Sequence, residues 1–242
     1  MKRFYLSNMA RRYKRYEKHL FSNAEAVMPI SEQDKKEILS FSSPGILKYM
    51  PFGIDPGKYL SDYQGDGNTI CFMGALDWIP NQHGLKWFLN MVWPTLKEKL
   101  PNLSFHIAGR NAPDWMKSLL NTERVFFHGE VTNAKAFIVN YPIMIVPLFS
   151  GSGVRIKILE GLALERAIVS TSKGVEGLDV VHGKQLMIAD NPTDFCNHLI
   201  KITNDIFLQQ KLSEEARSFV CAGYDNNSLK IGIAEFYNEV LA

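Results

Sequence analysis

Short apolar segments alternate with amphipathic ones along most of the chain beyond residue 68. Segments rich in β-branched and aromatic residues predict strands at 69–74, 103–109, 124–129, 142–149 and 167–171. Apolar residues recur with helical spacing in the segments between them, at 82–99, 112–121, 132–140 and 154–166. Strands and helices that alternate in this way form a parallel sheet, and fully apolar strands indicate burial of both sheet faces. The pattern predicts a doubly wound, Rossmann-like α/β domain with helices on both faces.

The two ends of the chain have a different pattern. From about residue 192 to 242 the spacing is helical, with a break at CAGYDNNS, where Gly223 and the residues 226–228 supply capping chemistry. Near the other end, Ser31 with Asp34 three residues later predicts an N-cap and a helix after a short strand. Residues 1–40 contain too little strand to form a domain, so we expect them to be separate from a domain at 41–242.

A basic amphipathic helix is predicted within residues 1–20. Its apolar stripe consists of Leu6, Met9, Tyr13, Tyr16 and Leu20. Its other faces carry Arg11, Arg12, Lys14, Arg15 and Lys18. A helix of this kind could lie on an anionic membrane surface. Packing of the stripe on a neighbouring domain, with the charged face in water, is the commoner arrangement and is favoured here.

Composition limits the class of protein. The 242 residues are 46% hydrophobic and 21% charged, which indicates a packed globular protein, and a net charge of +2 argues against a dedicated nucleic-acid-binding protein. Cys71, Cys196 and Cys221 lack the spacing of a zinc site or a disulfide framework, so a reducing cytoplasm fits best. No apolar run approaches the roughly 18 residues of a membrane span.

The segment LFSGSGVRIKILEGLALE, residues 148–165, leads from a predicted strand into a predicted helix. In open α/β sheets, ligands bind at the carboxyl ends of the strands, and phosphates bind where a glycine-containing loop enters a helix. Gly151 and Gly153 permit close approach of the backbone, and Arg155 and Lys157 can neutralise a diphosphate. The segment therefore predicts a phosphate-containing ligand.

Glu160 falls beside the apolar arc of the same helix, between Ile156 and Leu164. A carboxylate there is costly unless a donor hydrogen-bonds to it, and the vicinal hydroxyls of a sugar are suitable donors. The alternative is a surface ion pair between Lys157 and Glu160, three residues apart. The sequence leaves both interpretations open.

Other predicted strands also end in glycine-containing loops that could form the walls of one pocket. The first loop, GALDWIPNQHG, follows the strand at 69–74 and begins at Gly74. Further candidates at strand ends are Gly109, Arg110, Gly129, Gly174, Glu176 and Gly177. Helical spacing assigns Trp87 and Trp93 to the core, and His83 is expected to be an ordinary polar residue rather than a base.

Four common catalytic or nucleotide-binding motifs find no match. The dinucleotide fingerprint GxGxxG fails at Ile156, where the third glycine would stand, although an epimerase or dehydrogenase stays an alternative. The P-loop pattern GxxxxGK[ST] is absent from the sequence. GxSxG and HExxH are absent as well, so hydrolase interpretations have no motif support.

Several of these segments together resemble the C-terminal, nucleotide-sugar-binding half of a GT-B glycosyltransferase of family 4, also called group 1. The resemblance covers roughly residues 25–242 and is most specific in PLFSGSGVRIKILEGLALERAIVST. The segments VMPISEQDKKEIL, KYMPFGIDPGKY, MGALDWIPNQHGLKWFLNMVWP and GVEGLDVVHGKQLMIADNP follow the family order. The resemblance implies a retaining enzyme that moves a sugar from a nucleoside diphosphate to a hydroxyl acceptor, without a metal ion or other cofactor.

The resemblance also assigns roles to individual residues. Glu160 matches the glutamate that holds the ribose hydroxyls, and Arg155 and Lys157 lie on the element that faces the diphosphate. The stretch Gly129, Glu130 and Val131 matches the backbone beside the base, and Glu176 and Gly177 match a segment that lines the donor pocket. The full set expected to bind the donor is Gly74, Arg110, Gly129, Glu130, Val131, Gly151, Ser152, Gly153, Arg155, Lys157, Glu160, Glu176 and Gly177.

The sequence departs from the family in three ways. A second glutamate, eight residues before the ribose-binding one, is replaced by Ser152. The residue after the first strand glycine is Ala75 where many members have an arginine. Most of the acceptor-side domain has no counterpart before residue 25, so the catalytic residues are unknown, and we expect donor binding with little or no transfer by this chain alone.

The expected partners follow from the same resemblance. They are a nucleoside-diphosphate sugar, a glycan or lipid-linked acceptor of polysaccharide or lipopolysaccharide synthesis, and a missing N-terminal domain or a second copy of the chain. The compartment expected is the cytoplasm, with peripheral contact to the inner face of the membrane. The last helix, SLKIGIAEFYNEVL, is expected to return to residues 1–40. A module that binds nucleotide or sugar without turnover is the alternative function.

Overall fold

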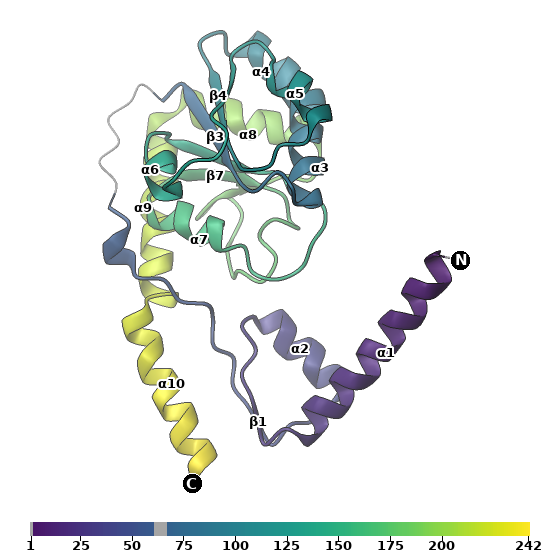
Figure 1. Cartoon of the computed structure of the whole chain (residues 1–242). Coiled ribbons are helices and arrows are strands. Elements are labelled where there is room, and N and C mark those ends of the chain that lie inside the picture. Colours follow the sequence, from purple (N-terminus) through teal and green to yellow (C-terminus); the bar gives the residue numbers. More distant parts are fainter. Residues whose placement is uncertain (1, 61–66) are drawn as a thin grey trace. The chain divides into compact units, whose positions relative to one another are not determined.

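The computed structural model describes residues 2–60 and 67–242 (Figure 1). The chain forms two compact units, and each has its own internal contacts. One consists of residues 54–225 and contains the predicted α/β domain. The other consists of residues 1–53 together with 226–242.

A parallel six-stranded sheet forms the centre of the larger unit, in the order β5-β4-β3-β6-β7-β8 (Figure 1). The strands are β3 (Thr69–Met73), β4 (Ser104–Ala108), β5 (Val125–Phe127), β6 (Ile143–Val146), β7 (Ala167–Ser170) and β8 (Met187–Ile188). Sequence analysis placed the first five of these and missed β8. The two-residue β8 is too short for its side chains to show a periodic pattern.

Helices cover both faces of this sheet, which confirms the predicted fold class. They are α3 (Ile79–Trp87), α4 (Trp93–Lys99), α5 (Asp114–Leu120), α6 (Ala134–Ile138), α7 (Ile156–Ala163), α8 (Pro192–Asn204) and α9 (Ile206–Gly223), with a 3₁₀ turn η1 at Pro56–Lys58. The helix predicted at 82–99 is interrupted by a π-helical turn, η2 (Phe88–Val92). Pro94 has no N–H to donate to Asn90, which accounts for the altered winding just before it.

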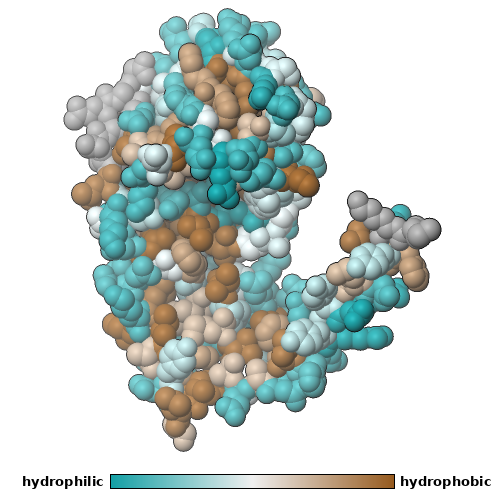
Figure 2. Space-filling model, in the orientation of Figure 1, coloured by the Kyte–Doolittle hydropathy of each residue, from teal (hydrophilic) through white to brown (hydrophobic). Residues whose placement is uncertain are grey.

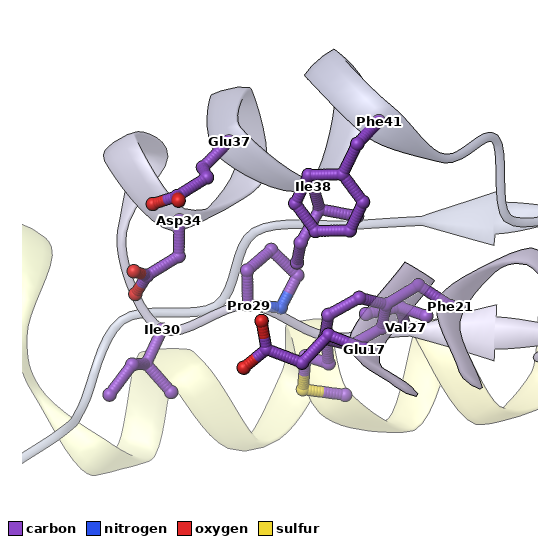
Figure 3. A pocket seen from close by; sticks show the side chains of 10 residues that line it. Glu17, Phe21, Val27, Pro29, Ile30, Asp34, Glu37, Ile38 and Phe41 are labelled. Carbon is purple, nitrogen blue, oxygen red and sulfur yellow. The ribbon is translucent and has the colours of Figure 1, made fainter. Parts of the chain in front are cut away.

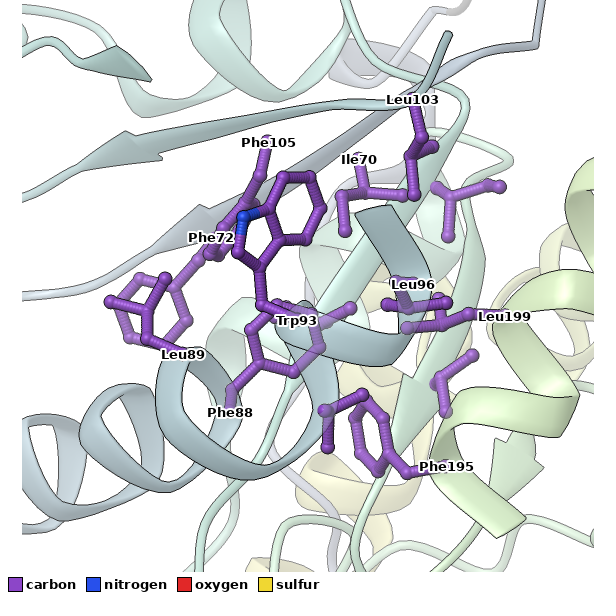
Figure 4. Packing of buried hydrophobic residues seen from close by; sticks show 14 of the residues in the cluster. Ile70, Phe72, Phe88, Leu89, Trp93, Leu96, Leu103, Phe105, Phe195 and Leu199 are labelled. Atoms are coloured by element: carbon purple, nitrogen blue, oxygen red, sulfur yellow. The ribbon is translucent and has the colours of Figure 1, made fainter. Parts of the chain in front are cut away.

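Successive residues of the strands face opposite layers of the core. Ile70 and Phe72 of β3 lie in one buried cluster, while Cys71 between them lies in the other. The first cluster is aromatic: the ring centroids of Phe88 and Phe105 are 4.9 Å apart, and Trp93 packs beside them (Figure 4). Burial on both faces explains why these strands are apolar throughout.

The smaller unit contains α1 (Lys2–Asn23), β1 (Ala26–Val27), α2 (Glu32–Phe41), β2 (Ile46–Leu47) and α10 (Asn226–Leu241). The Ser31 hydroxyl accepts the Asp34 amide at 3.0 Å, which confirms the predicted N-cap. The last helix contacts the stretch 48–53: Lys48 Nζ lies 3.4 Å from Glu235 Oε2. It belongs to the same unit as residues 1–53, while the expected packing against residues 1–40 stays a prediction.

The apolar stripe of α1 is exposed within its unit. Leu6, Tyr13, Tyr16 and Leu20 are between 47% and 60% accessible, and the favoured packing of this stripe on a neighbouring domain stays a prediction. The surface over α1 accordingly mixes hydrophobic and hydrophilic patches (Figure 2). Among the described residues, no helix is both long and apolar enough to cross a membrane.

Candidate functional site

The polar residues predicted to bind a ligand gather where the order of the strands reverses. From β3 the chain moves outward to β4 and β5, and it then returns to β6, on the other side of β3. The loops that follow β3 and β6 therefore lie side by side at the carboxyl ends of the strands, the position at which open α/β sheets bind ligands in a crevice. Gly84 of α3 holds them close, because a Cβ at this position would lie 1.7 Å from the carbonyl oxygen of Pro147.

Glycines in these loops adopt backbone conformations that other residues rarely adopt. Gly151 and Gly153 have φ angles of +97° and +85°, which turn the loop between β6 and α7. Gly129 and Gly177, at two other predicted positions, have φ angles of +66° and +82°. A substitution at any of these four glycines would strain the backbone. Gly74 is required for space instead, since a Cβ would lie 2.7 Å from Asn81 Nδ2.

Lys157 points from α7 toward the end of β3. Its Nζ donates to the carbonyl of Met73 at 3.2 Å and to Asn81 Oδ1 at 3.1 Å, and it lies 4.8 Å from the centroid of the Phe72 ring. Burial, helped by the nearby charge of Arg155, lowers the pKa of Lys157 to about 7. Its partners here are neutral oxygens, so an anion in the crevice would gain a charged hydrogen-bond donor.

Arg155 is the N-cap residue of α7, and it is buried, with 8% of its surface accessible. Its Nη1 donates to the carbonyl of Ser152 at 2.6 Å, and its guanidinium lies 5.2 Å from the centroid of the Trp78 ring. Burial lowers the pKa of Arg155, and the Glu176 carboxylate opposes that effect. Arg155 thus joins the loop after β6 to the loop after β3, and it interacts electrostatically with the turn after β7.

Glu160 is held by a residue that the sequence analysis did not single out. The Tyr59 hydroxyl donates to Glu160 Oε1 at 3.0 Å, across 101 positions of the sequence. Lys135 Nζ of α6 lies 3.8 Å from the centroid of the Tyr59 ring on its other side. Lys157 and Glu160 have these separate partners and form no ion pair in the described part of the chain. The simple surface ion pair is therefore not the arrangement found.

The other predicted site residues occupy different environments. Arg110 is exposed and its Nε lies 3.9 Å from Asp77 Oδ2, at the outer side of the loop after β3. The carbonyl of Gly129 accepts the Gly109 amide at 2.8 Å, which ties the loop after β5 to the end of β4. Glu130 is exposed, Val131 packs partly against the second core cluster, and Ser152 is exposed.

Three residues of the site received no role from the sequence. Asn81 is buried and its Nδ2 donates to the carbonyl of Ala75 at 2.8 Å, so it fixes the loop after β3 while it accepts from Lys157. Trp78 covers Arg155, and Tyr59 contacts Glu160. The Trp-x-Pro-Asn segment at 78–81 was the sequence signal that could have identified two of these residues, Trp78 and Asn81. Trp87 and Trp93 pack in the core, which confirms that expectation, and His83 is exposed on α3.

A hollow in the smaller unit has the wrong chemistry for a phosphate ligand. It lies between α1 and α2 and is lined by Phe21, Ile38 and Phe41 together with the carboxylates of Glu17, Asp34 and Glu37 (Figure 3). Three carboxylates without a cation would repel an anion. No cluster of three or more potential metal ligands occurs within the described ranges. The crevice of the larger unit is therefore the better candidate site.

The parallel six-stranded sheet with helices on both faces is of the Rossmann-like type that forms the C-terminal half of GT-B glycosyltransferases. The family model described as glycosyl transferases group 1 matches residues 67–205, and the chain belongs to this family. An uncharacterized 44.6 kDa protein in the cps region of Klebsiella pneumoniae is 30% identical over 170 residues. That match covers 66% of this chain and 44% of the relative, so the chain spans less than half of the relative's length.

Solved structures share the fold at low sequence identity. Anabaena HepE in complex with UDP and glucose is 13% identical, with a TM-score of 0.71 over 90% of this chain and 64% of that chain. TarM is 15% identical, with a TM-score of 0.78 over 93% of this chain and 46% of that chain. The fold is that of the C-terminal half of GT-B glycosyltransferases, as the sequence predicted.

Proposed function

We propose that residues 54–225 bind the nucleoside-diphosphate-sugar donor of a retaining glycosyl transfer to a hydroxyl acceptor, without a metal ion. One observation carries the proposal: Arg155 and Lys157 stand at the switch point, and neither forms an ion pair within the described residues. Both belong to the loop and first turn of α7, where phosphates are bound in folds of this type. Two cations left without carboxylates are suited to a diphosphate.

Each part of the donor has a proposed position. The diphosphate would accept hydrogen bonds from Lys157 and Arg155 and from the amides around Gly151 and Gly153. The ribose hydroxyls would donate to Glu160, which α7 places one turn from its start at Ile156. The base would lie beside residues 129–131, and Gly74, Arg110, Ser152, Glu176 and Gly177 would complete the pocket.

The biological setting is part of the proposal. A relative from a cps region and a structural neighbour that holds UDP and glucose support a role in polysaccharide, lipopolysaccharide or glycolipid synthesis in the cytoplasm. The acceptor would be a glycan or a lipid-linked glycan, met at the inner face of the membrane. As the resemblance implies, this chain alone would bind the donor and transfer little or no sugar.

A second candidate function is a binding module without turnover. The observation that favours it is Ser152, which is exposed at the position where many family members carry a glutamate that meets the donor sugar. Under this alternative the chain binds a nucleotide sugar yet leaves it intact. Release of free nucleoside diphosphate from a donor sugar, followed with and without a glycan acceptor, separates the two candidates.

Donor binding is tested by calorimetric titration of the purified chain with UDP, GDP, ADP and NAD. We expect saturable binding of one nucleoside diphosphate, and a loss of about 10- to 100-fold in Glu160→Gln, because hydrogen bonds to a charged group contribute about 1.5 to 3 kcal/mol. The matched control is Glu98→Gln on the exposed side of α4, which should bind as the wild type does. Binding of NAD alone, or unchanged affinity in Glu160→Gln, would overturn the proposal.

A further inference from the structure

Arg155 carries hydrogen-bonding groups that the protein itself does not satisfy. Its side chain is more than nine-tenths buried, and only Nη1 has a partner, the carbonyl of Ser152. Nε and Nη2 are buried without a hydrogen bond to any described residue. Unpaired donors on a buried cation are costly, and native proteins keep such groups mainly where a ligand, ion or ordered water completes them.

Glu176 carries a buried hydrogen-bond acceptor to which no described residue donates. Its Oε1 accepts from Lys173 Nζ at 2.6 Å, while Oε2 is buried and has no donor among the described residues. Five buried side-chain atoms lack a partner in the described part of the chain, and three of them belong to Arg155 and Glu176. The two side chains attract each other electrostatically but form no direct salt bridge. The two opposite charges therefore interact without a direct hydrogen bond between them.

The strand topology explains why the two groups face one crevice. Val146 of β6 pairs with Ser170 of β7, so the loops that leave these strands start side by side. Arg155 belongs to the loop after β6, and Glu176 belongs to the turn after β7. Ser152, in the loop after β6, is exposed and has no carboxylate to offer. Glu176 supplies a carboxylate from the neighbouring strand end.

The chemistry of the unpaired Arg155 and Glu176 atoms indicates which ligand groups would pair with them. The Arg155 nitrogens require an acceptor, and a phosphate oxygen is the strongest one available to a guanidinium. A carboxylate is acceptor-only, so Oε2 of Glu176 requires a donor such as a hydroxyl. The ligand must present a phosphate oxygen and a hydroxyl next to each other. A nucleoside diphosphate ends in phosphate, whereas its sugar ester adds the hydroxyls.

We propose that Arg155 and Glu176 bind the sugar-phosphate end of the donor, with Glu176 accepting a hydrogen bond from a sugar hydroxyl in place of the glutamate that Ser152 replaces. This inference rests on the proposed function, and it adds a specificity-determining residue to it. Glu176 then distinguishes a sugar nucleotide from the free nucleoside diphosphate. Arg155 contacts both ligands through the phosphate that they share.

The test compares two ligands with the same base. UDP and UDP-glucose are titrated calorimetrically into the wild type and into Glu176→Gln, and GDP and GDP-mannose are used in the same way if the chain binds GDP. Glu176→Gln should weaken binding of the sugar nucleotide about tenfold and change binding of the nucleoside diphosphate less than about twofold, because only the sugar donates to the lost charge. Arg155→Lys should weaken binding of both ligands, because a lysine lacks the several fixed donors of the planar guanidinium.

Lys173→Met is the matched control, since it breaks the Lys173–Glu176 pair and leaves the carboxylate in place. It should bind both ligands as the wild type does. Equal losses for the two ligands in Glu176→Gln, or no loss for either, would overturn the inference while the proposed function stands. Failure of the wild type to bind UDP, GDP, ADP or their sugar esters would instead overturn the proposed function, and the inference with it.

Discussion

The Tyr59 hydroxyl donates a hydrogen bond of 3.0 Å to Glu160 Oε1, and so one oxygen of the proposed ribose-binding carboxylate is held before a nucleotide arrives. Burial, together with the charge of Glu160, raises the pKa of Tyr59 to about 12. The phenol therefore remains a donor at neutral pH. The backbone of Tyr59 is fixed as well, because Arg217 Nη1 donates to its carbonyl at 2.5 Å.

Tyr59→Phe should weaken binding of the nucleoside diphosphate about 3- to 10-fold. The variant keeps the ring and loses one hydrogen bond, which contributes about 0.5 to 1.5 kcal/mol, and the carboxylate becomes free to rotate. Calorimetry with UDP and 2′-deoxy-UDP measures the effect, which should be smaller for the deoxy ligand. If Tyr59→Phe bound UDP more tightly, Tyr59 would compete with the ribose instead of orienting Glu160.

The lowered pKa of Lys157 predicts that the protein takes up a proton when it binds a nucleotide. In the folded protein its pKa is about 7, below the ordinary value of 10.5, so the Lys157 amine is neutral in most molecules at pH 8. A diphosphate favours the charged form and raises the pKa again. Binding enthalpies at pH 8 in buffers of different ionisation enthalpy should show this uptake. Lys157→Met should abolish it, and the exposed Lys211→Met should retain it; equal uptake in Lys157→Met would contradict the assignment.

The same shift has a consequence for stability. Between pH 7 and pH 10.5 the unfolded chain holds the Lys157 proton more tightly than the folded chain does. The contribution of Lys157 to the free energy of unfolding therefore rises with pH across this window. Denaturant titrations of the wild type and Lys157→Met at pH 7 and pH 9 measure it: the wild type should gain stability relative to the variant at the higher pH. A constant difference between the two proteins would contradict the shift.

Substitution of Gly84 tests the close packing beside the crevice, and the same substitution at Gly223 is its control. A Cβ at Gly84 would meet the carbonyl oxygen of Pro147, and Gly84→Ala should cost about 1 to 3 kcal/mol of stability and also weaken nucleotide binding. A Cβ at Gly223, in the last turn of α9, meets nothing within 4 Å, and Gly223→Ala should gain up to about 1 kcal/mol. Thermal unfolding of both variants checks the prediction, and equal melting temperatures would refute it.

The local pattern of side chains determined much of this protein. Alternating apolar strands and amphipathic helices were sufficient to predict the parallel sheet, because burial of both faces leaves a direct trace in residues such as those of β6. Gly151 and Gly153 with Arg155 and Lys157 marked the candidate site, because the chemistry of phosphate binding is concentrated in one loop and the helix turn after it.

Only the tertiary structure decided which distant groups meet. Tyr59 reaches Glu160, Asn81 reaches Lys157, and Glu176 stands in the field of Arg155. Each of these pairs joins different loops or strand ends, and spacing along the chain carries no trace of such contacts. Periodicity reports which face of an element is buried, whereas the choice of partner follows from how the strands are ordered in the sheet.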